Sequence, residues 1–175
     1  MEQLGLGSES LRPENPRLIY TAISGFGTQG PLNNAPAYDP VVQAHAGFTA
    51  IQGTDNPEFM RSMICDKITA YTACQAVTAA LLVREKTNEG QHIDISMLDS
   101  GLFFLFPDGF MNHTLLDDDV EVGKHLADVM YNLTETRDGG IIISAATEQH
   151  IRGTLQVAGR HDLIDDPRFT TVVTL

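Results

Sequence analysis

A long Ala-rich segment at residues 67–86 constrains the fold more than any other feature of the sequence. It is apolar on most sides, ends in basic residues and is followed by Asn88-Glu89-Gly90, a combination typical of a buried helix and its C-terminal end. A β-rich segment precedes it at 17–24, and a segment of alternating apolar residues follows it at 91–97. The order strand, helix, strand predicts an α/β fold.

Shorter elements complete the predicted order. Helices are expected at 40–51 and at 98–106, and the second leads to Pro107. After an acidic segment, the sequence predicts strands at 129–135 and 140–146, a turn between them at 137–139, and a helix at 148–157.

This order predicts three parts. Residues 1–106 are expected to form an α/β domain, residues 107–128 a linker, and residues 129–175 part of a smaller α+β domain.

The charge of the chain excludes one class of partner. The sequence holds 23 acidic and 11 basic residues, a formal charge of −12, and has no basic stripe that could neutralise phosphates. We therefore expect no nucleic acid partner. The sequence also has no apolar run long enough to span a membrane and no signal-peptide pattern, so we expect no membrane partner and a cytoplasmic location.

The cysteines and histidines do not predict a metal site. Cys65 and Cys74 lie within one element and have no metal-ligand spacing, so we expect two buried, reduced thiols. The histidines are scattered along the chain and are interpreted as structural or surface residues. We therefore expect no metal cofactor.

A glycine-rich motif at 25–30 resembles a dinucleotide-binding fingerprint but lacks its context. That fingerprint requires a helix to begin immediately after the glycines, and here Pro31 and Pro36 follow with two asparagines between them. Nicotinamide binding is therefore not expected. The glycines instead allow a sharp turn or a close approach of the backbone to another group.

Asp66 is the leading candidate for chemistry. It stands after an apolar and neutral run, at the start of the predicted helix at 67–86. A carboxylate in this position can cap the helix, since Asp is among the best N-cap residues. It can also act as a nucleophile. Spacing alone favours capping.

Several spaced motifs run along nearly the whole chain. They are residues 15–20, 24–27 and 30–31, Ala37-Tyr38-Asp39 with Gln43, Ala44 and Gly47, Asp66 and residues 79–82, 87–91 with Asp94, Asp99-Ser100, and 138–139, 159–163 and 166–169. Together these motifs resemble the family III CoA-transferases, which include formyl-CoA transferase, carnitine CoA-transferase and α-methylacyl-CoA racemase.

The resemblance implies a fold and a reaction. The fold would be part of a Rossmann-like first domain followed by part of a smaller α+β domain, and 1–106 would be the C-terminal part of a CoA-binding, catalytic domain. Asp66 would attack an acyl-CoA thioester to give an aspartyl-acyl mixed anhydride, and a small carboxylic acid would then exchange in. The resemblance thus reverses the preference for capping. A CoA thioester is the expected substrate and a homodimer the expected assembly.

The resemblance also implies a CoA site. The segment of Tyr38 lines that site in the family, so Tyr38, Ala37, Gly25 and Gly27 are the candidate CoA-binding residues. The racemases carry a catalytic histidine where Tyr38 stands, and the nearby His45 is expected to be a helix or packing residue. Transferase chemistry is therefore preferred to racemisation.

Three hypotheses remain open, because family members are more than twice this length and the portion with most CoA contacts has no counterpart before Met1. The first hypothesis is that the chain is a family III CoA-transferase, either short or completed by another polypeptide. Alternatively, it is a catalytically silent remnant or self-association module of that fold. The third alternative is an acyl-CoA racemase-like enzyme that uses another base.

Overall fold

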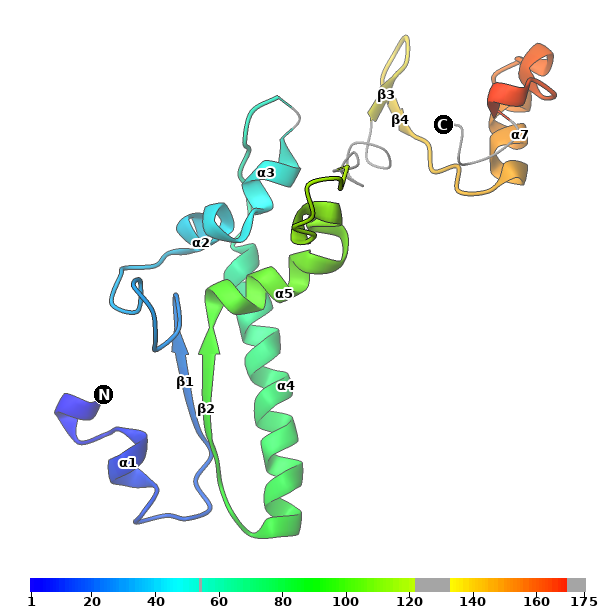
Figure 1. The fold of residues 1–175 in the computed structure, drawn as a ribbon. Coiled ribbons are helices and arrows are strands. Elements are labelled where there is room, and N and C mark those ends of the chain that lie inside the picture. The colour runs from blue at the N-terminus through cyan, green and yellow to red at the C-terminus, as the bar shows by residue number, and fades with distance from the viewer. Residues whose placement is uncertain (54, 122–132, 170–175) are drawn as a thin grey trace. The chain divides into compact units, whose positions relative to one another are not determined.

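The computed structural model of the protein describes residues 1–53, 55–121 and 133–169 (Figure 1). The chain divides into two compact units, 1–126 and 127–175, and each is described by itself. The fold is mixed α/β, as the order of the sequence patterns predicts.

A strand, helix, strand unit forms the centre of the first unit. Strands β1 (Tyr20–Ser24) and β2 (His92–Ser96) pair in parallel, from Tyr20 opposite His92 to Ser24 opposite Ser96. Helix α4 (Ile64–Thr87) runs beside them and returns the chain from the carboxyl end of β1 to the start of β2 (Figure 1). Both strands and the helix were predicted, although β1 begins three residues later than expected.

Helix α4 differs from its prediction in two respects. It begins at Ile64 rather than Lys67, and its buried residues are few: Cys65, Ile68, Thr69 and Ala80. The prediction of a buried helix is therefore wrong for most of its length. Ala-rich composition predicted the helix itself, because Ala has the highest helix propensity, but did not determine how much of it is covered.

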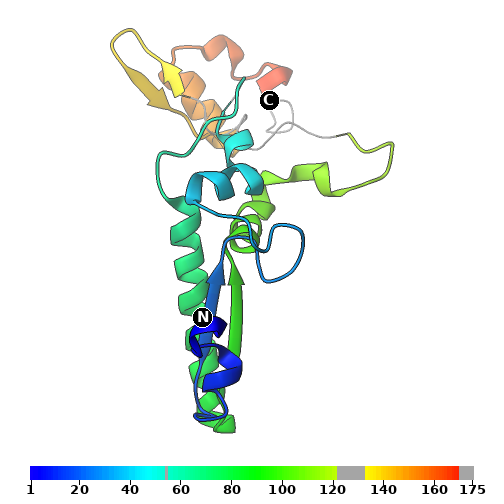
Figure 2. The ribbon, with the colours of Figure 1, turned by 90° about the vertical axis from the view of Figure 1, so that its left-hand side faces the viewer.

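Two short helices replace the single helix predicted at 40–51. Helix α2 (Asp39–Ala46) and helix α3 (Phe48–Gln52) are separated by Gly47, whose φ is 91°. This left-handed conformation favours glycine and ends α2. Figures 1 and 2 both show α2 and α3 beyond the carboxyl ends of β1 and β2.

Helix α5 (Met97–Gly109) follows β2 directly. Ser96 caps it locally, because its Oγ accepts a hydrogen bond from the backbone N–H of Asp99 at 3.2 Å. The helix continues through Pro107, so the expected end at 106 is wrong. Proline removes one backbone donor and usually ends or kinks a helix, yet here it lies only two residues before the last one.

The core of the first unit lies where α2, α3, α4 and α5 meet. Its buried members are Val42, Ala46, Phe48, Cys65, Ile68 and Leu105. Gly101 permits the close approach of α5, because a Cβ added there would lie 3.3 Å from the Cβ of Ala46. This core holds the first turn of α4 against α2.

The N-terminal elements, η1 (Glu2–Leu4) and α1 (Ser8–Leu11), precede β1. The chain after them is held to the turn between α4 and β2, since Pro16 O accepts from Gly90 N at 2.7 Å. A short helix, η2 (Met111–Thr114), follows α5.

The second unit has two antiparallel strands, β3 (Leu133–Glu135) and β4 (Gly140–Ile142). Helix α7 (Glu148–Val157) has the predicted bounds, and Thr147 caps it. Two short helices, η3 (His161–Leu163) and η4 (Pro167–Phe169), end the described part. The predicted strand residues 129–132 lie outside the described residues.

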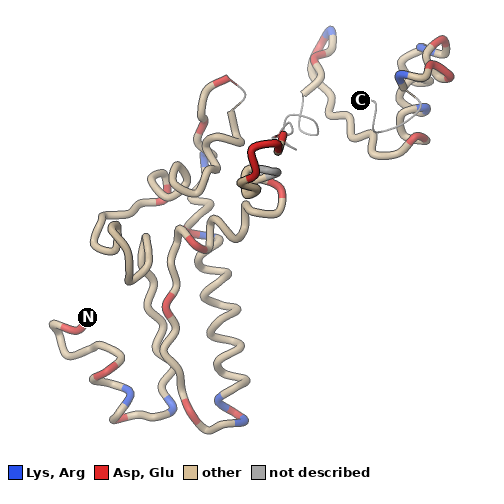
Figure 3. Tube along the Cα trace, viewed as in Figure 1, with Lys and Arg blue, Asp and Glu red and all other residues tan. Residues whose placement is uncertain are grey.

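Acidic residues occur along both units, including the run at 117–119 (Figure 3). None of the helices in the described residues combines the length and the apolar character needed to cross a membrane.

Candidate active site at the start of helix α4

Asp66 is the third residue of α4, and its side chain is exposed. The N-cap position belongs to Met63, whose side chain makes no capping hydrogen bond. The capping interpretation of Asp66 is therefore wrong, because the helix begins before it. Its carboxylate is not used by the start of its own helix and faces solvent.

A buried carboxylate on another helix caps α4 instead. Asp39, at the first turn of α2, is only 5% exposed, and its Oδ2 accepts a hydrogen bond from the backbone N–H of Asp66 at 3.0 Å. The free N–H groups of a helix start carry partial positive charge, so a carboxylate is a favourable partner there. Asp39 thereby fixes the backbone of the residue that carries the candidate nucleophile.

Gln43 extends this contact to the segment before α4. Its Nε2 donates to Asp39 Oδ1 at 2.5 Å, to Ser62 O at 3.0 Å and to Met60 O at 3.2 Å, and its Oε1 accepts from Met60 N at 3.1 Å. Gln43 is 1% exposed. Asp39 and Gln43 stand four residues apart on one face of α2, and this Asp39–Gln43 pair holds residues 60–66 in place.

The sequence patterns do not predict this pair as a functional element, although both residues belong to the family-like motifs. The available signal was two hydrogen-bonding residues at a spacing of four, on the helix that precedes Asp66 in the chain.

The backbone donors at the start of α4 are largely used. Ile64 N donates to Ser62 O at 2.8 Å, Asp66 N donates to Asp39, and Lys67 N donates to Met63 O at 3.2 Å. These three N–H groups are therefore not available to an oxyanion. The bound carboxylate of Asp39 offsets the positive end of the helix dipole here.

Cys65 stands beside Asp66 but has a different environment. Its thiol is fully buried, and burial together with the carboxylates of Asp39 and Asp66 raises its pKa to about 12. It is therefore a neutral thiol at physiological pH, and a thiol is a poor nucleophile compared with a thiolate. Cys74 is exposed, so the prediction of two buried thiols is wrong for that residue, and both cysteines are free.

The structure brings Gly25 and Ala37 into contact. A side-chain carbon added at Gly25 would overlap Ala37 Cβ, and Gly25 O accepts from Leu98 N at 3.0 Å. The prediction of a close backbone approach is confirmed at Gly25. Gly27 has a φ of 86°, which favours glycine, and its N–H donates to Ser24 Oγ at 3.1 Å.

Tyr38 precedes Asp39 as the N-cap residue of α2, and its ring side chain is 74% exposed. The next residue, Asp39, accepts the hydrogen bond from Asp66 N, so the segment of Tyr38 is hydrogen-bonded to the start of α4. Four of the predicted site residues, Gly25, Gly27, Ala37 and Tyr38, thus lie on the connection between β1 and α2. Ligands of open parallel sheets commonly bind at this kind of position, outside the carboxyl ends of the strands.

The other sequence motifs have structural roles here. No helix follows the glycines at 25–30, since the next one begins at Asp39. His45 is bonded through Nδ1 to Val41 O at 2.9 Å, and its ring packs edge-on against Phe26 at 5.2 Å. Within the part of the chain that the structure describes, no three His, Cys, Asp or Glu side chains are grouped as metal ligands would be.

A cavity of about 410 Å³ opens beside the start of α4. Its lining comes from α2 and from the segment before α4, and consists of Asp39, Pro40, Gln43, Phe59, Met60, Arg61, Ser62 and Met63.

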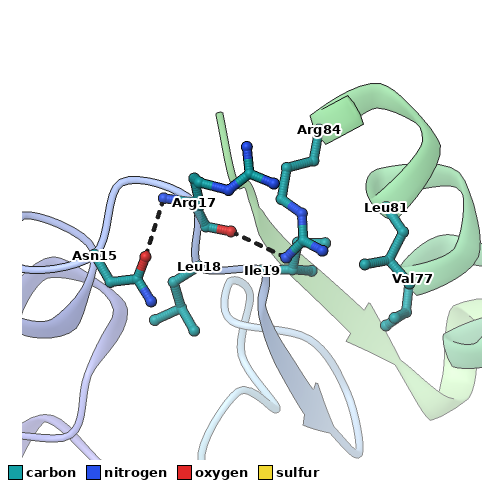
Figure 4. A pocket seen from close by; sticks show the side chains of 7 residues that line it. All are labelled: Asn15, Arg17, Leu18, Ile19, Val77, Leu81 and Arg84. Carbon is teal, nitrogen blue, oxygen red and sulfur yellow. Dashed lines mark hydrogen bonds between the residues drawn. The ribbon is translucent and has the colours of Figure 1, made fainter. Parts of the chain in front are cut away.

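A second cavity, of about 420 Å³, lies near the other end of α4 (Figure 4). Arg17 and Arg84 belong to its lining, but Arg17 bonds Glu85 and Asn88, and Arg84 Nη1 donates to Arg17 O at 3.4 Å. Arg84 is about 27 Å from Asp66 along the axis, at about 1.5 Å per residue. This cavity is therefore separate from the candidate active site.

A family model for CoA-transferase family III matches residues 1–174. The chain belongs to this family. The CoA-transferase family III chain is 31% identical over 175 residues to the succinate–glutarate CoA-transferase of Agrobacterium fabrum, covering 98% of its own length and 44% of that protein. It is 32% identical to the acetyl-CoA:oxalate CoA-transferase of Acetobacter aceti, covering 97% and 44% of the two chains.

Solved structures agree with this assignment. The crystal structure of Rv3272 from M. tuberculosis superimposes with a TM-score of 0.84 at 31% identity, over 99% of this family III chain and 46% of that one. The fold is therefore that of CoA-transferase family III. The chain spans less than half the length of the relatives it matches.

Proposed function

We propose that the chain is an acyl-CoA:carboxylate CoA-transferase in which Asp66 is the nucleophile. The observation that carries this proposal is the arrangement at the start of α4, where the exposed carboxylate of Asp66 projects from a backbone position fixed by buried Asp39. The names of the related CoA-transferases support the same reaction class.

The first step is nucleophilic acyl transfer. A carboxylate oxygen of Asp66 attacks the thioester carbonyl of the acyl-CoA, the new C–O bond forms, and the C–S bond breaks to release CoA as its thiolate. The product on the protein is an aspartyl-acyl mixed anhydride. A carboxylate is a weak nucleophile, but covalent catalysis replaces one large barrier with smaller ones.

The second step exchanges the acids. The acceptor carboxylate attacks the Asp66 carbonyl carbon and expels the donor acid as a carboxylate. The CoA thiolate then attacks the acceptor carbonyl of the new anhydride, which forms the product thioester and restores the Asp66 carboxylate. Charge is conserved throughout, and no redox partner is required.

The surroundings of Asp66 favour its carboxylate as the nucleophile. Its side chain is exposed, and its backbone is fixed by the hydrogen bond to Asp39. The buried, neutral thiol of Cys65 does not compete as a nucleophile.

We propose that CoA lies along the connection between β1 and α2. The exposed ring of Tyr38 is available for stacking, and Gly25 and Gly27 add no side chains of their own to this connection. The remaining CoA contacts are expected from the part of the family's length that this chain does not span.

We also propose that the active form is a homodimer. Helices α4 and α5 expose large apolar side chains, including Tyr71 at 70%, Leu82 at 63% and Phe103 at 85%. Exposed apolar surface of this kind is typical of protein interfaces. Light scattering at micromolar concentration is expected to give at least the dimer mass, and a monomer mass would refute this part of the proposal.

The test of the reaction is CoA transfer from an acyl-CoA to a labelled carboxylic acid. Asp66→Asn is expected to abolish transfer while keeping the shape of the side chain. Asp99→Asn is the matched control, because Asp99 is also an exposed carboxylate at the third residue of a helix. Transfer that survives in Asp66→Asn would reject Asp66 as the nucleophile, and its absence in the unmodified chain would favour the silent-module hypothesis.

A further inference from the structure

The cavity of about 410 Å³ at the start of α4 has a mixed lining. Its apolar side chains are Pro40, Phe59, Met60 and Met63, and its polar ones are Asp39, Gln43, Arg61 and Ser62. Its size is within the range of about 300–1,000 Å³ that small-molecule sites occupy.

The cavity is adjacent to Asp66. Asp39 lines it and also accepts the hydrogen bond from Asp66 N. Met63 lines it as well and is the N-cap of α4, so the cavity and Asp66 are within about one helical turn of each other. A molecule that reacts at Asp66 can therefore extend into this space.

Most polar groups of the lining already have partners. Asp39 and Gln43 bond to each other, and Ser62 Oγ accepts from Lys67 Nζ at 2.7 Å. Arg61 is different, because its exposed guanidinium makes no hydrogen bond or ion pair with any residue that the structure describes. It is a cation at the cavity with its N–H donors free.

A free guanidinium selects for a particular ligand group. Its planar donors match a carboxylate, which can accept two parallel hydrogen bonds from it. A chain with a formal charge of −12 repels anions overall, so an acidic ligand requires a local cation of this kind. The apolar side chains of Phe59 and Met63 suit a short methylene chain.

We propose that this cavity binds a short dicarboxylate, and that Arg61 binds the carboxylate distal to the reacting one. The inference rests on the proposed transferase function, since it assigns the second carboxyl group of the acid that reacts at Asp66. One carboxyl group is exchanged at Asp66, the methylene chain lies on the apolar wall, and the other carboxylate bonds Arg61. Arg61 thereby determines specificity for dicarboxylates over monocarboxylates.

Equilibrium binding tests this assignment without any covalent step. Labelled glutarate and pentanoate, which have the same chain length, are titrated into the chain and followed by NMR. Arg61→Gln is expected to weaken glutarate binding about tenfold, because one charge-assisted hydrogen-bonding contact is lost. The same change is expected to leave pentanoate binding unchanged. Arg137→Gln is the matched control, because Arg137 is an exposed arginine of the other unit and its loss changes the net charge equally.

Three binding results would overturn the inference. These are no glutarate binding by the unmodified chain at millimolar concentration, glutarate bound no more tightly than pentanoate, or equal effects of the Arg61 and Arg137 changes. The same titration in Asp66→Asn separates this inference from the proposed reaction. Arg61-dependent glutarate binding in that variant supports the site even where transfer is absent, whereas CoA transfer to glutarate that does not depend on Arg61 rejects the site and retains the reaction.

Discussion

Asp39 Oδ2 accepts a hydrogen bond from the backbone N–H of Asp66 at 3.0 Å, so a buried carboxylate on α2 caps the helix that presents an exposed one. Two carboxylates in sequence motifs of the family thereby have different tasks. One is desolvated and hydrogen-bonded, which is a structural role, and the other is exposed, as the proposed nucleophile requires.

The long-range cap is expected to contribute more to stability than a local one. Asp39→Ala removes the acceptor of Asp66 N and of Gln43 Nε2, and is expected to lower the free energy of unfolding by about 2–3 kcal/mol. Ser96→Ala removes only the local cap of α5 and is expected to lower the free energy of unfolding by about 1 kcal/mol. Urea unfolding of both variants measures the difference, and an equal or smaller loss for Asp39→Ala would contradict the long-range role.

A carboxylate in place of the Gln43 amide is expected to make stability depend on pH. Gln43→Glu puts a second acid against Asp39 and against the carbonyls of Met60 and Ser62. Repulsion raises the folded-state pKa of the new group above its unfolded value, so the folded state binds its proton more tightly. The loss of stability is therefore largest at neutral pH and shrinks as pH falls. Urea midpoints at neutral and mildly acidic pH measure this, and a loss that does not change with pH would reject it.

The contact between Gly25 and Ala37 is expected to show coupling in a double-mutant cycle. Gly25→Ala would overlap Ala37 Cβ and is expected to cost about 1–3 kcal/mol of stability. Ala37→Gly removes that Cβ, and the next nearest atom, Ala37 Cα, is 3.6 Å from the added carbon, an ordinary contact. The double variant should therefore recover much of the loss. Additive effects of the two changes would mean that the segments at 25 and 37 do not touch.

The two cysteines are expected to differ in reactivity. In the native protein at mildly alkaline pH, iodoacetamide should modify exposed Cys74 and leave Cys65 unmodified, whereas both should react in denaturant. Peptide mass mapping measures this. Modification of Cys65 in the native protein at the rate of Cys74 would contradict its burial.

The Cys65 thiol also contributes a pH dependence of stability with a defined sign. Its pKa is raised from 9.0 to about 12, so between these values the folded state holds a proton that the unfolded state has released. The contribution of the protonated Cys65 thiol to the free energy of unfolding is therefore complete below pH 9 and is lost as pH rises toward 12.

Local patterns predicted the central elements because those elements depend on local interactions. Alternating apolar residues predicted β2, and Ala-rich composition with a terminal Asn88 predicted α4. The N-terminal end of α4 was predicted three residues late, because its cap comes from Asp39, 27 residues earlier in the chain. A capping residue so far away in the sequence produces no recognisable sequence pattern next to the helix.

Burial was harder to predict than secondary structure. Cys74 and most of α4 were expected to be buried because their neighbours are apolar, but coverage depends on which other segments pack there. The break at Gly47 was visible as a glycine within a helical pattern, yet only the left-handed φ identifies it as the end of α2. The candidate nucleophile came from the family resemblance, whereas the partners that hold its backbone came from the structure.

The intact mass of the chain after incubation with short acyl-CoAs tests the central claim most directly. We predict an acyl adduct that hydroxylamine removes, present in the unmodified chain and in Asp99→Asn and absent in Asp66→Asn. An adduct that persists in Asp66→Asn, or no adduct and no CoA binding in the unmodified chain, would contradict a working nucleophile at Asp66.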